Sequence, residues 1–210
     1  DQIDFLPLKS YANITEGNAL RLNWEDVVPK TKLNYIMGNP PFVGARLMDA
    51  SQKSDVNLIF EGWKNVGNLD YVCCWYKKAA DLMQGTEIRS ALVSTNSVSQ
   101  GESVANRWKP LFEAGVHIDY AYRTFRWDSE AKIKAHVHCV IIGFSIAPNH
   151  EERILYSGDR AQVVQNINGY LLDAENVFVE SRNKPLCTVP EIGIGNKPID
   201  CGHYLFTTEE

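Results

Sequence analysis

Apolar and polar positions alternate along the chain with two periods, one typical of strands and one typical of helices. Short apolar runs at Leu33 to Met37 and Ile88 to Thr95 predict two buried strands. Apolar residues three or four positions apart predict an amphipathic helix from Leu69 to Met83 that closes near Gly85, and a further helix is expected over Glu102 to Glu113. The pattern therefore predicts strands and helices in alternation.

Two more strands, His117 to Thr124 and His136 to Phe144, follow with no room for a helix between them, so we expect them to pair as a hairpin. The order of elements predicts an α/β fold, with an open, Rossmann-like parallel sheet that finishes with one antiparallel strand. In open sheets of this kind, ligands bind at the carboxyl ends of the strands. We therefore expect residues 39–42, 96–97 and 125–127 along one rim.

The periodic pattern weakens after Pro148, where prolines and glycines separate short apolar runs. We interpret residues 149–210 as an irregular C-terminal arm and residues 1–148 as the sheet-forming part. This division leaves one main domain with an appendage.

The loop Asn39-Pro40-Pro41-Phe42 carries the strongest chemical signal, because it places an amide, a stiff carbonyl and an aromatic ring directly after a strand. An exocyclic amine is a poor nucleophile, and an amide oxygen plus a backbone carbonyl can accept its two protons and favour a pyramidal nitrogen. Proline fixes its own φ and restricts the conformation of the residue before it, so the Asn39 side chain and the Pro40 carbonyl keep a fixed orientation. Phe42 offers a stacking face for a flipped base. The alternative is a plain Pro-Pro turn.

Net charge is −5, so any contact with nucleic acid must be local. Such a place is the stretch from Arg123 to Lys134, where basic side chains, Arg123 and Arg126 among them, are interleaved with Phe125 and Trp127. A solvated hairpin loop is the alternative interpretation.

The chain has 210 residues, of which 44% are hydrophobic and 22% charged, as expected for a folded domain. No apolar run approaches the ~20 residues that cross a bilayer, and no signal-peptide pattern is present, so we expect no membrane contact and a cytoplasmic location. His136 and His138 share a strand face without a third ligand, and no metal site is predicted. Five cysteines lack a Cys-x-x-Cys pair and are expected to be reduced and mostly buried: Cys73, Cys74, Cys139, Cys187 and Cys201.

Together with an upstream Gly17-Asn18-Ala19, the Asn-Pro-Pro-Phe loop resembles the corresponding motifs of the amino-methyltransferases. The rest of the sequence resembles the MmeI-like bacterial restriction-modification enzymes. The strings that carry the second resemblance are Asp70-Tyr71-Val72, Trp75-Tyr76, Lys78-Ala79-Ala80, Ser94–Glu102, Arg123–Trp127, Glu130–Lys132 and Val137–Phe144.

The resemblance implies a class I methyltransferase sheet that transfers methyl from S-adenosyl-L-methionine to adenine N6 in double-stranded DNA after base flipping. By matching positions, Asn39 to Phe42 would form the catalytic loop and Asn18 would touch the adenine of the cofactor. Phe125 and Trp127, with Arg123 and Arg126, would line the base pocket or the DNA-facing rim. Residues 149–210 would lead toward a target-recognition domain.

The family also has a glycine-rich turn and an acidic ribose-binding residue ahead of the position of Asn18, and the seventeen residues before Asn18 contain no glycine-rich loop. We therefore expect this chain to lack the main cofactor-binding motifs, to be inactive alone, and to self-associate through an incomplete sheet edge. Two alternative functions stay open: methylation of a protein glutamine or of RNA, and a non-catalytic DNA-binding module.

Overall fold

The computed structural model describes residues 13–101, 103–128, 136–148, 152–180, 184 and 187–189. Residues 1–180 form one compact unit and residues 181–210 a second. The longer helices are α2 (Ala50–Ile59), α3 (Cys73–Met83) and α4 (Ser103–Glu113), and the short ones are α1 (Trp24–Val27), η1 (Lys30–Lys32), η2 (Val66–Asn68) and η3 (Asn96–Ser99). The strands are β1 (Tyr35–Gly38), β2 (Arg89–Thr95), β3 (His117–Asp128), β4 (His136–Ser145), β5 (Arg153–Ser157) and β6 (Arg160–Val164).

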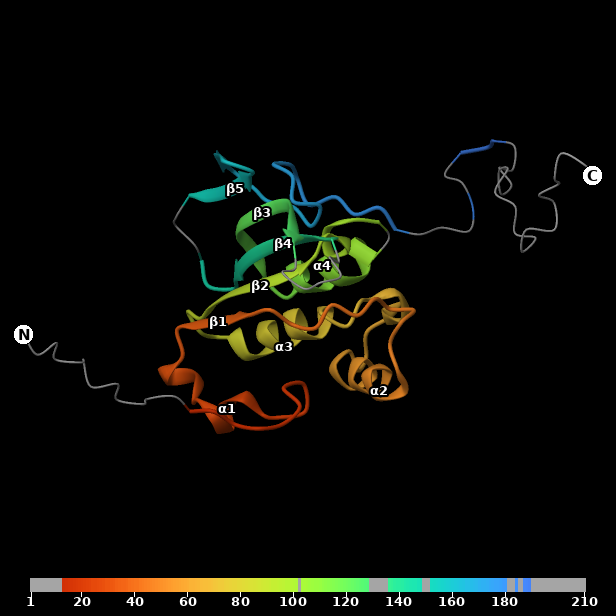
Figure 1. Ribbon diagram of the computed structural model, residues 1–210. Helices are drawn as coiled ribbons and strands as arrows, with labels where there is room; N and C mark the ends of the chain where they lie inside the picture. Colours follow the sequence, from red (N-terminus) through yellow and green to blue (C-terminus); the bar gives the residue numbers. More distant parts are fainter. Residues whose placement is uncertain are drawn as a thin grey trace, which may run out of the picture. The chain divides into compact units, whose positions relative to one another are not determined.

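The strands form one open sheet in the order β1-β2-β4-β3-β5-β6 (Figure 1). The β1–β2 and β3–β5 pairs are parallel, whereas β4 is antiparallel to both of its neighbours and β6 is antiparallel to β5. Four strands, β1, β2, β3 and β5, therefore run in one direction. The predicted α/β class is confirmed, and so are the parallel pairing of the first two strands, the helix before Gly85 and the hairpin. The prediction that the first strand is buried is wrong, because β1 lies at the edge of the sheet and is mostly exposed.

The sheet continues further along the chain than expected, because β5 and β6 lie in residues assigned to the irregular arm. Both strands have only five residues, and each has a single buried residue, Leu155 in β5 and Val164 in β6, so they carry little apolar periodicity in the sequence. The hairpin is also longer than expected. Residues 125–128, which lie beyond the predicted strand, extend β3 to Asp128.

Helix α2 was not predicted, because its residues have weak hydrophobic periodicity. The helix starts at a capping box, in which the Asp49 carboxylate accepts from the Gln52 backbone N–H at 2.8 Å and the Gln52 side chain accepts from the Asp49 N–H at 3.1 Å. Helix α3 begins later than the periodicity indicated, at Cys73. The preceding residues form η2 and a turn.

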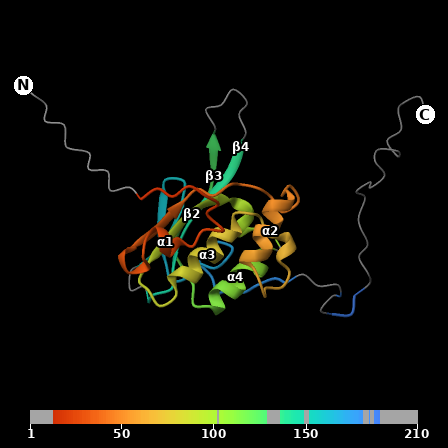
Figure 2. The same cartoon turned by 90° about the horizontal axis from the view of Figure 1, so that it is seen from below.

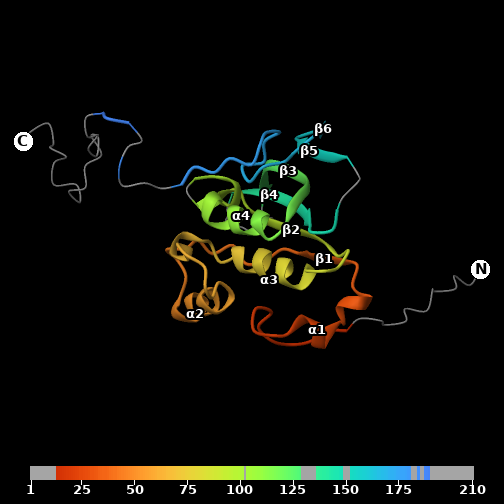
Figure 3. The same cartoon turned by 180° about the vertical axis from the view of Figure 1, so that it is seen from behind.

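Helices α3 and α4 cover one face of the sheet, in front of the strands in Figure 3. Tyr76 of α3 is fully buried there, stacked on Phe144 of β4 with ring centroids 5.3 Å apart and in edge contact with Trp108 of α4 at 5.5 Å. Its hydroxyl is 2.7 Å from Ser94 Oγ, which keeps the buried phenol hydrogen-bonded. Burial raises the pKa of Tyr76, so the phenol stays protonated in the core.

The opposite face carries Gly143 of β4 under the ring of Tyr120 of β3. A Cβ atom built on Gly143 would lie 2.2 Å from a ring carbon of Tyr120, closer than any real contact. The absence of a side chain at this position therefore lets the Tyr120 ring lie flat against the sheet.

Strand β1 lies at one edge of the sheet and pairs only with β2 among the described strands. Its Tyr35 and Met37 side chains are 65% and 79% exposed. An exposed strand edge with large apolar side chains is a surface on which another strand or chain can pair. Self-association through this edge stays a prediction.

Three of the five cysteines, Cys73, Cys74 and Cys139, are buried free thiols, as expected, and Cys187 is exposed. Cys201 lies outside the described residues. Burial raises the pKa of the Cys73 thiol, which accepts from the Arg107 guanidinium at 3.0 Å. Within the described part of the chain, no helix is long and apolar enough to cross a bilayer.

Candidate active site

The Asn-Pro-Pro-Phe loop lies at the carboxyl edge of the sheet, directly after β1. Asn39 and Pro41 are exposed, Pro40 is buried and Phe42 is half-buried. The buried Pro40 anchors the loop, while the Asn39 amide is open to the surface. This is the arrangement that an amide acting on an external amine requires.

Three segments predicted along one rim do share an edge. Strands β1 and β2 are parallel, so Asn39 and Asn96 follow the same ends of two neighbouring strands. Strand β3 runs in the same direction, and Phe125 pairs with Cys139, which pairs with Thr95 at the end of β2. Topology and register therefore bring the Asn-Pro-Pro-Phe loop, the end of β2 and the aromatic segment of β3 to one side of the fold.

A cavity of about 680 Å³ opens beside the loop and along β1. Asn39, Pro40 and Pro41 line one part of it, and Ala19 with Trp24 lines another. Its described lining is mostly apolar and contains no carboxylate. The cavity can accept a flat apolar group with a polar edge, such as a purine, but it offers no acidic partner for ribose hydroxyls.

The segment from Asn18 to Trp24 is held against α3 by Lys78. The Lys78 ammonium donates to the backbone carbonyls of Leu20 at 2.7 Å and Leu22 at 2.6 Å, and it lies 5.4 Å from the centre of the Trp24 ring. Burial lowers the pKa of Lys78 from its usual 10.5. One helix therefore positions the segment that lines the cavity.

Asn18 itself is exposed, but its amide is engaged inside the protein. Its Oδ1 accepts from the Leu20 N–H at 2.9 Å, and its Nδ2 donates to Asp55 Oδ2 at 3.0 Å. The side chain thus fixes the turn, and Ala19, its neighbour, lines the cavity. A direct contact from the Asn18 amide to a cofactor stays a prediction, and it would have to share the Oδ1 that already accepts from Leu20.

Asp55, on the unpredicted helix α2, is the centre of the hydrogen bonds that hold this turn. Its carboxylate is 1% exposed and accepts from Asn18, from Arg21 Nε at 2.7 Å and from the Tyr71 hydroxyl at 2.7 Å. Burial alone would raise the pKa of Asp55, but the bonds from Tyr71, Arg21 and Asn18 outweigh it and lower the pKa below 3.8. Burial and the Asp55 carboxylate together raise the pKa of Tyr71.

This shift predicts how stability depends on pH. Because the folded-state pKa of Asp55 lies below its ordinary value of 3.8, the stabilisation is complete above about pH 4 and is lost as pH falls through the folded-state pKa. Asp55→Asn should therefore lower the thermal midpoint at pH 6 and have a shrinking effect as the pH is lowered below 4. Thermal unfolding between pH 3 and 7 measures it. Asp26→Asn, at an exposed carboxylate, is the control, and an equal effect at every pH would contradict the assignment.

Phe125 and Trp127 lie two positions apart in β3, so they share a face of the strand, and a β-bulge lies just before them. Between the paired residues Tyr122 and Phe125, β3 has two residues, Arg123 and Thr124, where β4 has one. The two rings are 6.3 Å apart, and Trp127 is 46% exposed. The described ends of β3 and β4 project beyond the rest of the sheet and form a projecting arm, distinct from the C-terminal residues 149–210 (Figure 2).

Arg123 and Arg126 are both exposed on the same part of β3. Arg126 pairs with His138 in the ladder, on the face opposite Phe125 and Trp127. The projecting arm therefore has an aromatic face and a basic face, whereas the sequence predicted only that basic and aromatic side chains are interleaved in this segment.

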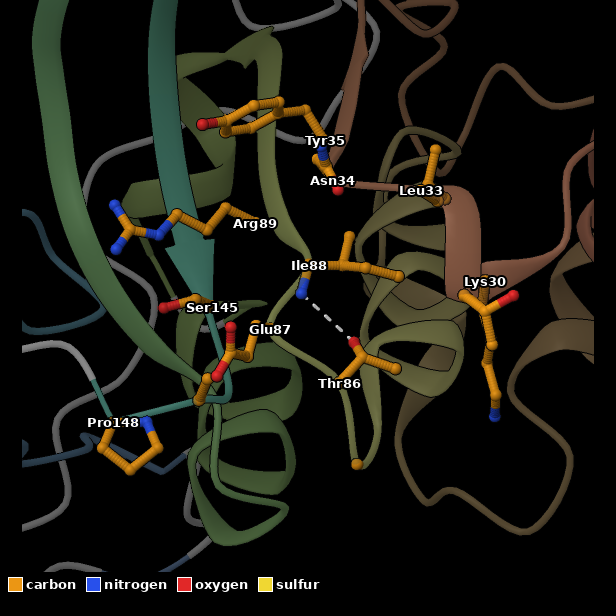
Figure 4. A pocket seen from close by; sticks show the side chains of 13 residues that line it. Lys30, Leu33, Asn34, Tyr35, Thr86, Glu87, Ile88, Arg89, Ser145 and Pro148 are labelled. Atoms are coloured by element: carbon orange, nitrogen blue, oxygen red, sulfur yellow. Dashed lines mark hydrogen bonds between the residues drawn. The ribbon is translucent and has the colours of Figure 1, made fainter.

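A second cavity lies away from these residues, at the amino ends of β1 and β2 (Figure 4). It has a volume of about 960 Å³ and is lined by Asn34, Thr86 and Arg89, with Ser145 from the end of antiparallel β4. Because ligands of open α/β sheets bind at the opposite, carboxyl ends, this cavity is not assigned to the site. The described residues contain no group of three or more metal-ligating side chains.

The sequence profile of the family described as MmeI, DNA-methyltransferase domain, matches residues 1–157. The chain is 39% identical over 207 residues to DNA methyltransferase A of Bacillus subtilis (strain 168), covering 98% of this chain and 24% of that protein. The structure of the Type IIL restriction-modification enzyme MmeI in complex with DNA has a TM-score of 0.89 at 43% identity, covering 97% of this chain and 28% of that one. The chain thus spans about a quarter of the length of these relatives.

The open sheet, with an Asn-Pro-Pro-Phe loop at its carboxyl edge, has the Rossmann-like fold of the methyltransferases. Within that class, the chain belongs to the family of the MmeI DNA-methyltransferase domain.

Proposed function

We propose that this chain is the catalytic-loop part of a restriction-modification enzyme that transfers methyl from S-adenosyl-L-methionine to adenine N6 in double-stranded DNA. The observation that carries the proposal is the exposed Asn39 amide, anchored by buried Pro40 at the carboxyl edge and open to a mostly apolar cavity. The family, and a relative whose structure is in complex with DNA, support it.

The loop acts on the amine of the target base. The Asn39 side-chain oxygen and the Pro40 carbonyl accept hydrogen bonds from the two amine N–H groups, which draws the nitrogen lone pair out of conjugation with the ring. S-adenosyl-L-methionine, when bound, supplies an electrophilic methyl group on a sulfonium. On transfer of that methyl to the nitrogen, the sulfur would keep the electron pair of the broken sulfur–carbon bond and the nitrogen would lose one proton to solvent. Alignment in such a site contributes up to about 7–11 kcal/mol.

The cavity beside the loop fits the cofactor in part. Ala19 and Trp24 offer a backbone edge and an aromatic surface for its adenine, and Asn39 lies where the methyl must be delivered. The ribose partner is not among the described lining residues, so the remaining contacts must come from residues other than these. The turn held by Asn18 positions the adenine end of the site.

Flipping takes the adenine out of the duplex and requires new stacking partners. Phe42 is the partner within the loop, and Phe125 or Trp127 is the partner from the projecting arm. Arg123 and Arg126 lie beside them and supply the local positive charge for phosphates that a chain of net charge −5 otherwise lacks. A cytoplasmic location is retained as a prediction, since both substrates are found there.

Phe42→Ala should weaken capture of the flipped base by about 1–3 kcal/mol, the value of one base–aromatic stack, and leave cofactor affinity nearly unchanged. Fluorescence of a duplex with 2-aminopurine at the target position measures the flipped state, and equilibrium dialysis measures cofactor binding. Because Phe60 is a buried core residue, Phe60→Ala controls for general unfolding. A larger loss of cofactor affinity than of base capture would contradict the stacking role.

The function itself is tested in the full-length protein with labelled S-adenosyl-L-methionine and duplex DNA, protein and RNA as competing acceptors. Mass spectrometry of the digested DNA should show N6-methyladenine. Label on a protein glutamine or on an RNA base would show that the methyl acceptor is protein or RNA and not DNA adenine. DNA binding without label on any acceptor would indicate a non-catalytic module.

A further inference from the structure

The segment that follows the Asn-Pro-Pro-Phe loop is hydrogen-bonded to Asp70 and Tyr71, which lie just before Val72 and the start of helix α3. The backbone N–H of Tyr71 donates to the Val43 carbonyl at 2.9 Å. The backbone N–H of Ala45 donates to the Asp70 side chain, at 2.9 Å from Oδ1. The loop therefore enters from β1 on one side and is clamped by Asp70 and Tyr71 on the other.

The second oxygen of Asp70 reaches a different strand end. Its Oδ2 accepts from Ser97 Oγ at 2.6 Å, and Ser97 Oγ is in turn 2.8 Å from Thr95 Oγ1. Thr95 ends β2, and Ser97 lies in the turn η3 that follows. One half-buried carboxylate thus joins the loop after β1 to the turn after β2. Hydrogen bonds to an ionised acceptor are short and stronger than neutral ones.

The hydrogen bonds of Asp70 matter because the Asn-Pro-Pro-Phe loop has few backbone donors with which to stabilise its own conformation. Pro40 and Pro41 have no backbone N–H, so half of the four loop residues cannot donate a backbone hydrogen bond. Buried Pro40 fixes the start of the loop, and the clamp on Val43 and Ala45 fixes its end. The aim of Asn39 and of the Pro40 carbonyl depends on both anchors.

We propose that Asp70 is a positioning residue for the reaction: its two oxygens, bonded to Ala45 and Ser97, set the position of the catalytic loop relative to the end of β2. Asp70 does not line the cavity beside the loop, so it acts through the loop. The inference rests on the proposed function for its effect on catalysis. The hydrogen bonds from Ala45 and Ser97 to Asp70, which we call the brace, belong to the fold and do not depend on the proposed function.

The test compares Asp70→Ala with Asp70→Asn in the full-length protein. Alanine removes both bonds, whereas asparagine keeps an acceptor for the Ala45 N–H and can donate to Ser97 Oγ. Asp70→Ala should lower kcat for methyl transfer about 10- to 100-fold, as expected for reacting groups displaced by about 1 Å, with DNA affinity within twofold. Asp70→Asn should restore kcat to within about threefold of the wild-type value. Asp81→Ala, at an exposed carboxylate of α3, is the matched control.

Hydrogen exchange of peptides covering residues 39–47 gives a readout that does not need activity. Asp70→Ala should accelerate exchange there, Ser97→Ala should do so less, and Asp70→Asn and Asp81→Ala should leave it unchanged. Unchanged exchange in Asp70→Ala, or accelerated exchange with normal kcat, would overturn the proposal. So would an equal loss of kcat in Asp70→Asn and Asp70→Ala, because it would mean that the charge acts directly. If Asp70→Ala fails to fold, Ser97→Ala carries the test.

A wild-type protein without methyl transfer would defeat the proposed function and leave the exchange comparison to decide whether Asp70 braces the loop. Conversely, an active wild type with unchanged exchange in Asp70→Ala and Ser97→Ala would defeat only the brace. The two failures are therefore distinguishable.

Discussion

Asn39→Ala is expected to lower the rate of methyl transfer by at least about 10²- to 10³-fold, the loss typical when one preorganised polar group is removed from an active site. The amide acts on the base amine and not on phosphates, so DNA affinity should stay within about twofold. Because Asn39 is exposed and the loop is anchored by buried Pro40, the substitution should leave the fold intact. Single-turnover transfer of labelled methyl and a DNA-binding titration measure the two effects.

Asn34→Ala is the matched control for this experiment. Asn34 is also an exposed asparagine and lies at the opposite end of β1, where its backbone carbonyl accepts from the Arg89 N–H at 3.1 Å. Its loss should change neither rate nor affinity. Normal transfer by Asn39→Ala would remove the proposed mechanism, and a parallel loss in both variants would point to a general effect on the strand.

Trp108→Ala is expected to lower the free energy of unfolding by about 3–5 kcal/mol, as for other buried Trp or Phe side chains replaced by alanine. Trp108 is fully buried on α4, its ring contacts Tyr76 and Phe112, and its indole N–H donates to the Val98 carbonyl at 3.1 Å. Alanine leaves a cavity and an unpaired carbonyl at the helix–sheet interface. Denaturant unfolding of the domain measures the change.

Trp127→Ala provides the control with the same chemical change on the surface. Trp127 is 46% exposed at the end of β3, so its loss should cost less than about 0.5 kcal/mol of stability. It should instead weaken DNA binding or base capture if the aromatic face of the arm contacts the substrate. Equal stability losses in the two variants would contradict the assignment of Trp108 to the core.

The sequence predicted the elements whose apolar periodicity is strong. Strands β1 and β2, helix α3 and the β3–β4 hairpin fall within a few residues of their expected positions. The catalytic loop was placed at the correct edge because its four residues directly follow a clear apolar run. Parallel strands then bring Asn39 and Asn96 together without further information.

The rest depended on contacts that no local pattern encodes. Helix α2 is weakly periodic, so its buried Asp55 could not be recognised as the partner of Asn18 and Tyr71, 37 and 16 residues away. The bonds that Asp70 makes to Ala45 and Ser97 likewise cross 25 and 27 residues. The one signal was the string Asp70-Tyr71-Val72, which carried the family resemblance but not a role. Strands β5 and β6 were missed because each has only five residues with one buried side chain and is stabilised by pairing with neighbouring strands.

The missing side chain at Gly143 has a consequence for the projecting arm. The Tyr120 ring occupies the space where any larger residue would have its Cβ, so a substitution at Gly143 must displace that ring. The same strand carries Phe125 and Trp127 only a few residues later. A substitution in the middle of the sheet is therefore expected to shift the end of β3, and comparison of Trp127 fluorescence in Gly143→Ala and wild-type protein measures this.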